Sequence, residues 1–153
     1  MKKDVLINYV CEVIYPNSSA YGIHVLKMCD AFASKNSKVN LISPHISINV
    51  NKLKINYRIK NKINFFSIFK NNNKINFIKR ILFSLKILKN KNFNTNNCLF
   101  ISRSVLFAVI GTFLKIKIIL ELHHELSGIT KVIYYFLKRI GLLKNLRYIF
   151  IHK

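Results

Sequence analysis

Cysteine is scarce in this sequence, and its spacing excludes two classes of small stabilised domain. The 153 residues contain three cysteines, Cys11, Cys29 and Cys98. Their number is odd and no two of them form a C-x-x-C pair, so neither a disulfide framework nor a zinc ribbon is indicated. Cys11 and Cys29 are expected to be small core residues, and a reducing cytoplasm is the compartment that fits best.

Long hydrophobic runs are absent as well. The longest apolar stretch, at 105–114, is well below the roughly 20 residues that a membrane-spanning helix needs, and lysines follow it at 115 and 117. The first apolar run, at 5–10, is too short for the core of a signal peptide and is interrupted by Asn8. We therefore expect a buried helix at 105–114 and no export of the protein.

Acidic residues are few: five Asp and Glu stand against 26 Lys and Arg, which gives a formal net charge of +21. None occurs between Asp30 and Glu121, so a basic face is expected, and such a face favours phosphates or anionic lipid. The abundance of Ile, Asn and Lys is also what AT-rich codons produce, so the charge alone is weak evidence for a nucleic-acid partner. No RNP-like, KH or zinc-finger pattern supports such a partner, and no specific nucleic acid is expected.

The order of the apolar segments predicts one α/β domain over 1–153. Hydrophobic residues make up 51% of the chain, which suits one compact core. Short β-branched runs alternate with segments of helical periodicity, and this alternation implies a doubly wound, mainly parallel sheet with helices on both faces. Strands are predicted at 5–10, 39–42, 98–102, 117–122 and 147–151. Helices are predicted after the first strand up to Ser34 and at 77–89, 104–114 and 130–140, and one or two edge strands at 54–59 and 63–68.

The loop after the first predicted strand has the features of an anion site. It runs from Tyr15 to Gly22 and leads into a helix, whose free backbone N–H groups and dipole attract anions. Ser19 is a candidate N-cap together with Asn17 and Ser18, and Gly22 would let the backbone approach a ligand closely. An ordinary capped turn explains the same residues equally well. No G-x-G-x-x-G is present, so a dinucleotide fingerprint is not supported.

Polar residues also follow two later strands. Arg103 comes directly after the strand at 98–102, while Glu121 and His123 lie at the end of the strand at 117–122. Because parallel strands end at the same edge of a sheet, we expect these three side chains to lie beside the loop that contains Gly22.

Simpler roles remain open for several of these residues. His24 follows the loop closely and would serve equally well by packing near the helix cap, and Arg103 and Glu121 would serve the structure alone as an ion pair. The adjacent His-His-Glu at 123–125 does not have the i, i+4 spacing that directs two imidazoles at one ion, so no metal is expected.

The segment at 77–89 predicts an amphipathic basic helix. Its apolar positions are Ile78, Ile81, Leu82, Leu85 and Leu88, and its basic positions are Lys79, Arg80, Lys86 and Lys89. A surface helix packed on the sheet is the simpler interpretation. The other is a helix that holds the protein on anionic membranes, and the two are compatible.

Four motifs in order resemble the N-terminal domain of family 4 glycosyltransferases. They are the run at 15–32, Val39-Asn-Leu-Ile-Ser-Pro44, Ile101-Ser-Arg-Ser104 and Ile119-Leu-Glu-Leu-His123. The resemblance covers nearly the whole chain. It implies a Rossmann-like domain that forms the acceptor-side half of a GT-B enzyme. Such enzymes transfer a sugar, with retention, from a nucleotide-sugar donor to a glycan or lipid-linked acceptor, as in cell-surface polysaccharide biosynthesis, and need no metal or other cofactor.

The resemblance also implies roles for individual residues. Gly22 resembles the family glycine near the donor diphosphate, although the family has a Gly-Gly pair where this sequence has one glycine. His123 resembles the strand-end histidine that contacts the transferred sugar, and it is the catalytic candidate. The substrate-binding candidates are Ser19, Gly22, His24, Arg103 and Glu121.

A second domain, which in the family carries the paired glutamates that hold nucleotide and sugar, has no counterpart in the 153 residues. We therefore expect a truncated or split enzyme that is inactive alone, in the cytoplasm at the inner face of the cell membrane. It is either a relic or a subunit that a separately encoded C-terminal domain completes. The missing partner should leave Phe136 and Ile149 poorly covered. The alternative function is a basic nucleic-acid-binding or anion-binding module on the same fold.

Overall fold

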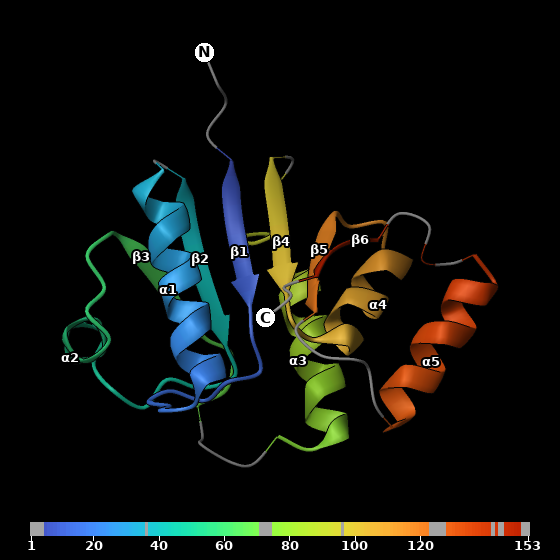
Figure 1. Ribbon diagram of the computed structural model, residues 1–153, viewed down its shortest axis with the longest axis horizontal. Coiled ribbons are helices and arrows are strands. Elements are labelled where there is room, and N and C mark those ends of the chain that lie inside the picture. The colour runs from blue at the N-terminus through green and yellow to red at the C-terminus, as the bar shows by residue number, and fades with distance from the viewer. Residues whose placement is uncertain are drawn as a thin grey trace.

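Parallel strands form the centre of the fold (Figure 1). The computed structural model describes residues 5–35, 37–70, 75–95, 97–122, 128–141, 143 and 146–150. Within them, six strands pair in the order β3-β2-β1-β4-β5-β6, and every pair is parallel. The strands are β1 (Leu6–Val10), β2 (Lys38–Ser43), β3 (Ile63–Ser67), β4 (Cys98–Ser102), β5 (Ile118–Leu122) and β6 (Arg147–Phe150). This is the doubly wound, Rossmann-like sheet that the alternation of segments predicts.

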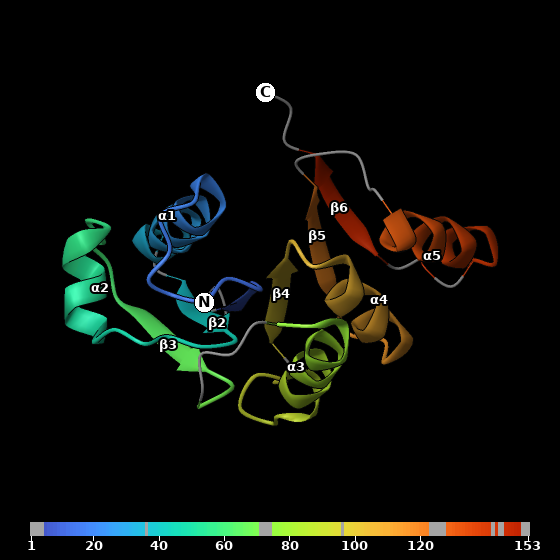
Figure 2. The same cartoon turned by 90° about the horizontal axis from the view of Figure 1, so that it is seen from below.

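Helices cover both faces of this sheet (Figure 2). On one face lie α1 (Ala20–Ser34) and α2 (Val50–Asn56); on the other lie α3 (Phe77–Lys89), α4 (Val105–Phe113) and α5 (Gly128–Arg139). The first core lies between the sheet and α1 and includes Tyr9 and Leu26. The second core lies on the opposite face, beneath α3 and α4, and includes Phe83 and Phe107. Full burial of such a side chain contributes about 1.5–3 kcal/mol, so these two cores hold the helices on the sheet.

Short polar side chains begin four of the helices. The side chains of Ser19, Asn49, Asn76 and Ser104 each accept a hydrogen bond from a backbone N–H in the first turn of α1, α2, α3 and α4, respectively. Such caps satisfy donors that have no partner inside the helix, and each contributes about 1 kcal/mol. Ser19 therefore has the capping role that the sequence predicts.

A ladder of three asparagine side chains crosses β3, β2 and β1. The Nδ2 atom of Asn64 donates to Oδ1 of Asn40 at 3.0 Å, and Nδ2 of Asn40 donates to Oδ1 of Asn8 at 2.8 Å. Asn8 completes the ladder by donating to the backbone carbonyl of Phe93 at 2.8 Å. Asn8 and Asn40 are buried. A slip of one residue in either strand pair would bury these amides without partners, so the ladder fixes the register.

The segment 49–59 corrects one expectation, because a helix forms where the strand at 54–59 is predicted. Asn49 caps α2, and Leu53 is buried while Ile55 is exposed. Leu53 and Tyr57, one helical turn apart, both pack on the first core. The apolar residues at 55, 57 and 59 alternate as in a strand, but the segment that contains the first of them is helical. The second predicted edge strand is present as β3.

Two further expectations concern apolar segments. The helix predicted at 105–114 is present as α4 and is mostly buried, although Phe113 is exposed. The side chains of Phe136 and Ile149 are 61% and 49% exposed. Among the described residues, no helix has both the length and the apolar character needed to cross a bilayer.

Candidate functional site

The carboxyl ends of β1, β4 and β5 meet at one edge of the sheet, toward which the strand arrows point in Figure 1. The residues after β1 lead into α1, Arg103 follows β4, and Glu121 lies at the end of β5. Strand order reverses between β1 and β4, which are neighbours although β2 and β3 separate them along the chain. In open α/β sheets ligands bind beyond the strand ends at this reversal point.

Glu121 is the centre of this edge. Its side chain is only 3% exposed and accepts a hydrogen bond from the Tyr9 hydroxyl. Its Oε1 lies 2.9 Å from Nε2 of His24 and 3.9 Å from Nε of Arg103. Burying a carboxylate is costly unless hydrogen bonds and opposite charges replace its water. Glu121 therefore joins β1, α1 and the end of β4 into one polar cluster.

Tyr9 supports this carboxylate from below. It is completely buried, and burial, followed by the neighbouring Glu121 carboxylate, raises the pKa of Tyr9 far above its usual value. Its hydroxyl therefore keeps its proton at physiological pH and is a permanent donor to Glu121. Tyr9 was not predicted as a site residue. Because Tyr9 lies within an apolar strand, its sequence context is that of an ordinary core aromatic residue and gives no sign of a role at the site.

Arg103 presents a cation at this edge. The carbon at the centre of its guanidinium lies 4.2 Å from the centroid of the Tyr21 ring, a cation–π contact. Its side chain is 14% exposed, and its Nε faces Glu121. The guanidinium is thus held in a fixed orientation by an aromatic ring and a carboxylate. A guanidinium fixed in this way suits a phosphate or a carboxylate, which it binds through two parallel hydrogen bonds.

A second carboxylate, Glu12, lies after β1. Its Oε1 accepts a hydrogen bond from the Ser104 hydroxyl at 2.5 Å, and its Oε2 lies 2.5 Å from Nη2 of Arg80. Because Ser104 also caps α4 and Arg80 belongs to α3, Glu12 links three elements. Sequence reasoning missed Glu12, although it lies only two residues after the end of β1. The same argument from strand ends would have found it.

The loop that leads into α1 is closed by its own side chains. Oδ1 of Asn17 accepts a hydrogen bond from the Ser19 N–H at 2.9 Å, and Oγ of Ser19 accepts one from the Gly22 N–H at 3.1 Å. A Cβ on Gly22 would lie 2.8 Å from Oδ1 of Asn17. Tyr57 holds Asn17 from the other side, because its hydroxyl exchanges 2.7 Å hydrogen bonds with the backbone N–H and carbonyl of that residue. Gly22 therefore makes room for the side chain of Asn17, which holds the N-cap residue Ser19.

The predicted site residues are thus partly assembled. His24, Arg103 and Glu121 are in contact, and Ser19 and Gly22 begin the helix that carries His24. His123 and the adjacent 124–125 lie outside the described residues. In the part of the chain that the structure does describe, no group of three or more His, Cys, Asp or Glu side chains could hold a metal ion.

The cysteines near this edge are structural. Cys11, after β1, and Cys29, in α1, are both buried in the core between α1 and the sheet. Burial raises the pKa of the Cys11 thiol to about 12 and that of Cys29 well above its usual value. Both therefore remain protonated thiols, which are poor nucleophiles. This agrees with the prediction that they are small core residues.

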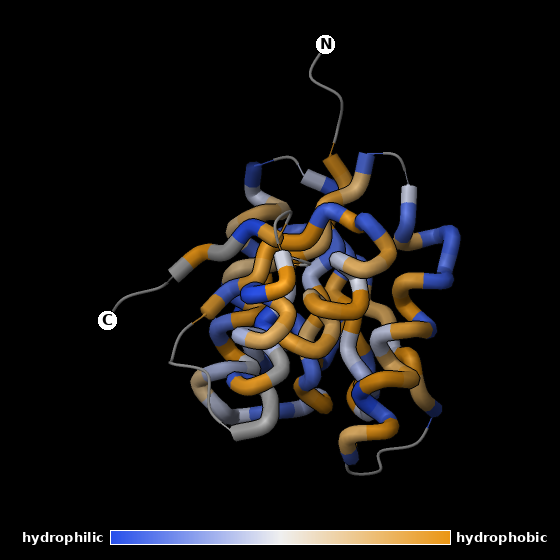
Figure 3. Tube along the Cα trace, turned by 90° about the vertical axis from the view of Figure 1, so that its right-hand side faces the viewer, coloured by the Kyte–Doolittle hydropathy of each residue, from blue (hydrophilic) through white to orange (hydrophobic). Residues whose placement is uncertain are grey.

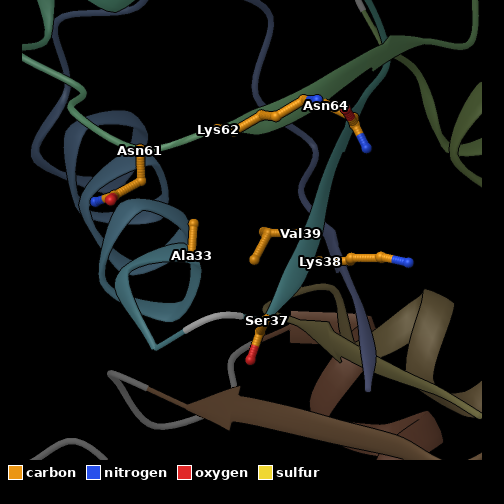
Figure 4. Close-up of a pocket in the computed structure, with 7 residues that line it drawn as sticks. All are labelled: Ala33, Ser37, Lys38, Val39, Asn61, Lys62 and Asn64. Carbon is orange, nitrogen blue, oxygen red and sulfur yellow. The ribbon is translucent and has the colours of Figure 1, made fainter. Parts of the chain in front are cut away.

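A cavity of about 420 Å³ lies at the opposite edge of the sheet (Figure 4). It lies between the C-terminal end of α1 and the starts of β2 and β3. Its lining residues are Ala33, Ser37, Lys38, Val39, Asn61, Lys62 and Asn64. Because the strands run away from it, it is separate from the cluster around Glu121.

No protein-family model, curated protein or solved structure matches this sequence. The arguments for function therefore rest on the fold, on the cluster around Glu121 and on the resemblance of the four sequence motifs.

Proposed function

We propose that this chain forms the acceptor-side half of a retaining glycosyltransferase that uses a nucleotide-sugar donor. The observation that carries the proposal is the contact of His24 and Arg103 with the buried Glu121, at the reversal point of a Rossmann-like sheet. Arg103 and Glu121 match family positions around the active-site cleft in the resemblance, and His24 is a further substrate-binding candidate from the sequence. They come from distant parts of the sequence and meet at the edge where such sheets bind ligands.

The chemistry of this cluster suits a diphosphate. Sugar transfer requires stabilisation of the negative charge that develops on the departing diphosphate, and such electrostatic stabilisation is often the largest catalytic contribution. In the proposal, Arg103, His24 and the positive end of the α1 dipole provide it. Glu121 is a positioning residue that holds the side chains of both Arg103 and His24. His123 keeps its proposed contact with the transferred sugar.

A second domain provides the other wall of the active site in this proposal. It holds the nucleotide and supplies carboxylates, and the acceptor is a glycan or a lipid-linked molecule at the inner face of the cell membrane. With one wall alone, water fills the site and the donor has little surface to bind. The 153 residues by themselves should then bind nucleotide sugars weakly and transfer no sugar.

The test is transfer and hydrolysis of a panel of nucleotide sugars by purified 1–153, with and without a separately expressed second domain from the same locus. Activity that appears only on mixing, and that falls at least tenfold in Arg103→Gln, supports the proposal; a change of that size is about 1.4 kcal/mol of lost stabilisation. Lys62→Gln, which removes a cation at the opposite edge of the sheet, is the matched control. Robust transfer by the isolated chain would exclude the need for a second domain.

The basic composition favours one alternative, an anion-binding module without transferase chemistry. Such a module would bind inorganic phosphate and nucleotides alike through Arg103 and would gain no activity on mixing. Sequence-independent binding of nucleic acid that disappears as salt rises would instead reflect general charge attraction. The three outcomes are therefore separable by the same set of variants.

A further inference from the structure

Helix α5 has an apolar side that nothing covers in the described structure. Tyr134 and Leu137 face the core next to α4. The opposite side carries large apolar residues whose exposed fractions are 70% for Val132, 54% for Tyr135, 61% for Phe136 and 51% for Ile140. Their spacing of three and four residues places them along one side of the helix. Figure 3 shows the side of the molecule on which α5 lies, where hydrophobic and hydrophilic segments alternate along the chain.

Lys131 and Lys138 lie at one margin of this apolar side, and Arg139 lies within it, one turn after Tyr135 and Phe136. Lys131, Lys138 and Arg139 are exposed, and within the described part of the chain none of them forms an ion pair. The sequence has no Asp or Glu from 126 to 153. A second copy of the chain would bring the same positive charge of +21, which disfavours self-association through this surface. Charge complementarity therefore points to an anionic partner.

The basic helix α3 is less free than its sequence suggests. Arg80 is bound to Glu12, and the Lys86 ammonium lies 5.0 Å from the centroid of the Phe69 ring. These two cations stabilise contacts within the fold. In α5, by contrast, all three basic side chains and all four exposed apolar side chains point away from the core.

We infer that α5 docks the protein on anionic membranes by lying parallel to the bilayer surface. Its exposed side chains Val132, Tyr135, Phe136 and Ile140 enter the boundary between headgroups and acyl chains, and Lys131, Lys138 and Arg139 contact lipid phosphates. This combination of an apolar stripe with aromatic residues and a basic margin is typical of helices at membrane interfaces. An acidic protein partner would need a complementary groove for a convex helix, whereas a bilayer accepts it without one. The inference does not depend on the proposed enzymatic function, and it assigns the exposed side chain of Phe136 to a membrane rather than to the face left open by a missing second domain.

The absence of tryptophan in the chain allows a direct test. Phe136→Trp places a fluorophore in the proposed interface, and Ile78→Trp places one at an equally exposed site on α3. The full chain is mixed with phosphatidylcholine vesicles that contain either no phosphatidylglycerol or 30% of it. We expect a blue shift and quenching by brominated lipid for Phe136→Trp with the anionic vesicles only, and a smaller change for Ile78→Trp.

Variants then separate the two contributions in vesicle co-sedimentation. Replacing Lys131, Lys138 and Arg139 with Gln should lower the partition coefficient about a hundredfold, because each basic side chain near an anionic surface contributes about a factor of five. Replacing Val132, Phe136 and Ile140 with Gln should lower it at least tenfold, while Ile78→Gln with Leu82→Gln on α3 should not. Val132, Phe136 and Ile140 are each more than half exposed, so their replacement should leave the fold intact, and circular dichroism checks this. Equal binding by the α5 and α3 variants would overturn the inference. So would a failure to bind anionic vesicles, or a dimer that the α5 changes dissolve.

Discussion

Nε2 of His24 lies 2.9 Å from Oε1 of Glu121, although 97 residues separate them in the sequence. The contact joins the second turn of α1 to the end of β5, above the strand β4 that lies between β1 and β5. An exposed histidine near the start of a helix would otherwise populate several side-chain rotamers. Here a buried carboxylate fixes its position, so the orientation of His24 depends on Glu121 and on the tyrosine beneath it.

Glu121→Gln tests this dependence. The amide keeps the shape of the side chain but loses the charge that faces His24 and Arg103, and it is a weaker acceptor for the Tyr9 hydroxyl. We expect the free energy of unfolding to fall by about 2 kcal/mol, which is less than for a fully buried pair because water still reaches the side chains of His24 and Arg103. Urea denaturation followed by circular dichroism measures the change.

Tyr9→Phe is the matched variant for the same cluster. It removes one buried hydroxyl and leaves Glu121 without that donor, so a loss of about 1–2 kcal/mol is expected. The double variant Tyr9→Phe/Glu121→Gln should lose about 1 kcal/mol less stability than the sum of the two single losses, because the two side chains contact each other directly. Strict additivity would show that the hydrogen bond between them contributes nothing to stability.

The asparagine ladder makes a second prediction about stability. Asn40→Leu leaves Oδ1 of the buried Asn8 and Nδ2 of Asn64 without their partners. We expect it to lower the free energy of unfolding by about 2–3 kcal/mol, because an unsatisfied buried polar group costs about 1–3 kcal/mol. Asn64→Leu, at the exposed end of the ladder, should cost under about 1 kcal/mol, since Asn64 itself is exposed and water can replace its amide group. Equal losses for the two variants would contradict this account.

Asp30 gives a prediction that depends on pH. Its Oδ1 accepts hydrogen bonds from the backbone N–H groups of Lys60 and Asn61, at 3.1 and 2.8 Å, and from Nδ2 of Asn61 at 2.9 Å. Burial alone would raise the pKa of this carboxyl, but these hydrogen bonds and nearby Lys27 lower it below the usual value. The bonds tie α1 to the start of β3.

A carboxyl whose pKa is lower in the folded chain stabilises the fold above its unfolded pKa, which is about 3.9 for Asp. This stabilisation disappears as the pH falls through the lower, folded pKa. At pH 7 we expect Asp30→Asn to be less stable than the natural chain by about 1 kcal/mol, and the difference to close below about pH 4. Urea denaturation at several pH values measures it, and a difference that does not change with pH would contradict the role of the charge.

Much of the fold follows from periodicity in the sequence. The strands are short β-branched runs, the long helices have apolar residues at helical spacing, and parallel order then places Arg103 and Glu121 at one edge. The alternation at 54–59 predicts a strand, but the Asn49 cap and the packing of buried Leu53 and partly buried Tyr57 on the core favour a helix.

Polar contacts between distant segments were harder to predict. Asn8 interrupts an apolar run, and only the register of β1, β2 and β3 shows that Asn40 and Asn64 stand opposite it. Tyr9 has no local signal for its contact with Glu121. A pair between Arg103 and Glu121 was foreseeable from strand ends, but the third partner, His24, depends on the position of α1 over the sheet.

Gly22 is required either by the packing of its own loop or by a ligand that approaches the backbone, and substitutions distinguish the two. In the natural chain, a Cβ at this position would lie 2.8 Å from Oδ1 of Asn17, so Gly22→Ala must displace a side chain that accepts a hydrogen bond from Ser19. Alanine is otherwise better in a helix than glycine by about 1 kcal/mol. We therefore expect Gly22→Ala to be neutral or slightly destabilising in the natural chain. In an Asn17→Ala background, which removes the clash, the same change should stabilise the fold by about 0.5–1 kcal/mol. The sign of this difference in urea denaturation is the measurement. If alanine stabilises both backgrounds equally, the close approach of Asn17 does not explain the glycine, and a ligand near the backbone becomes the better reason for it.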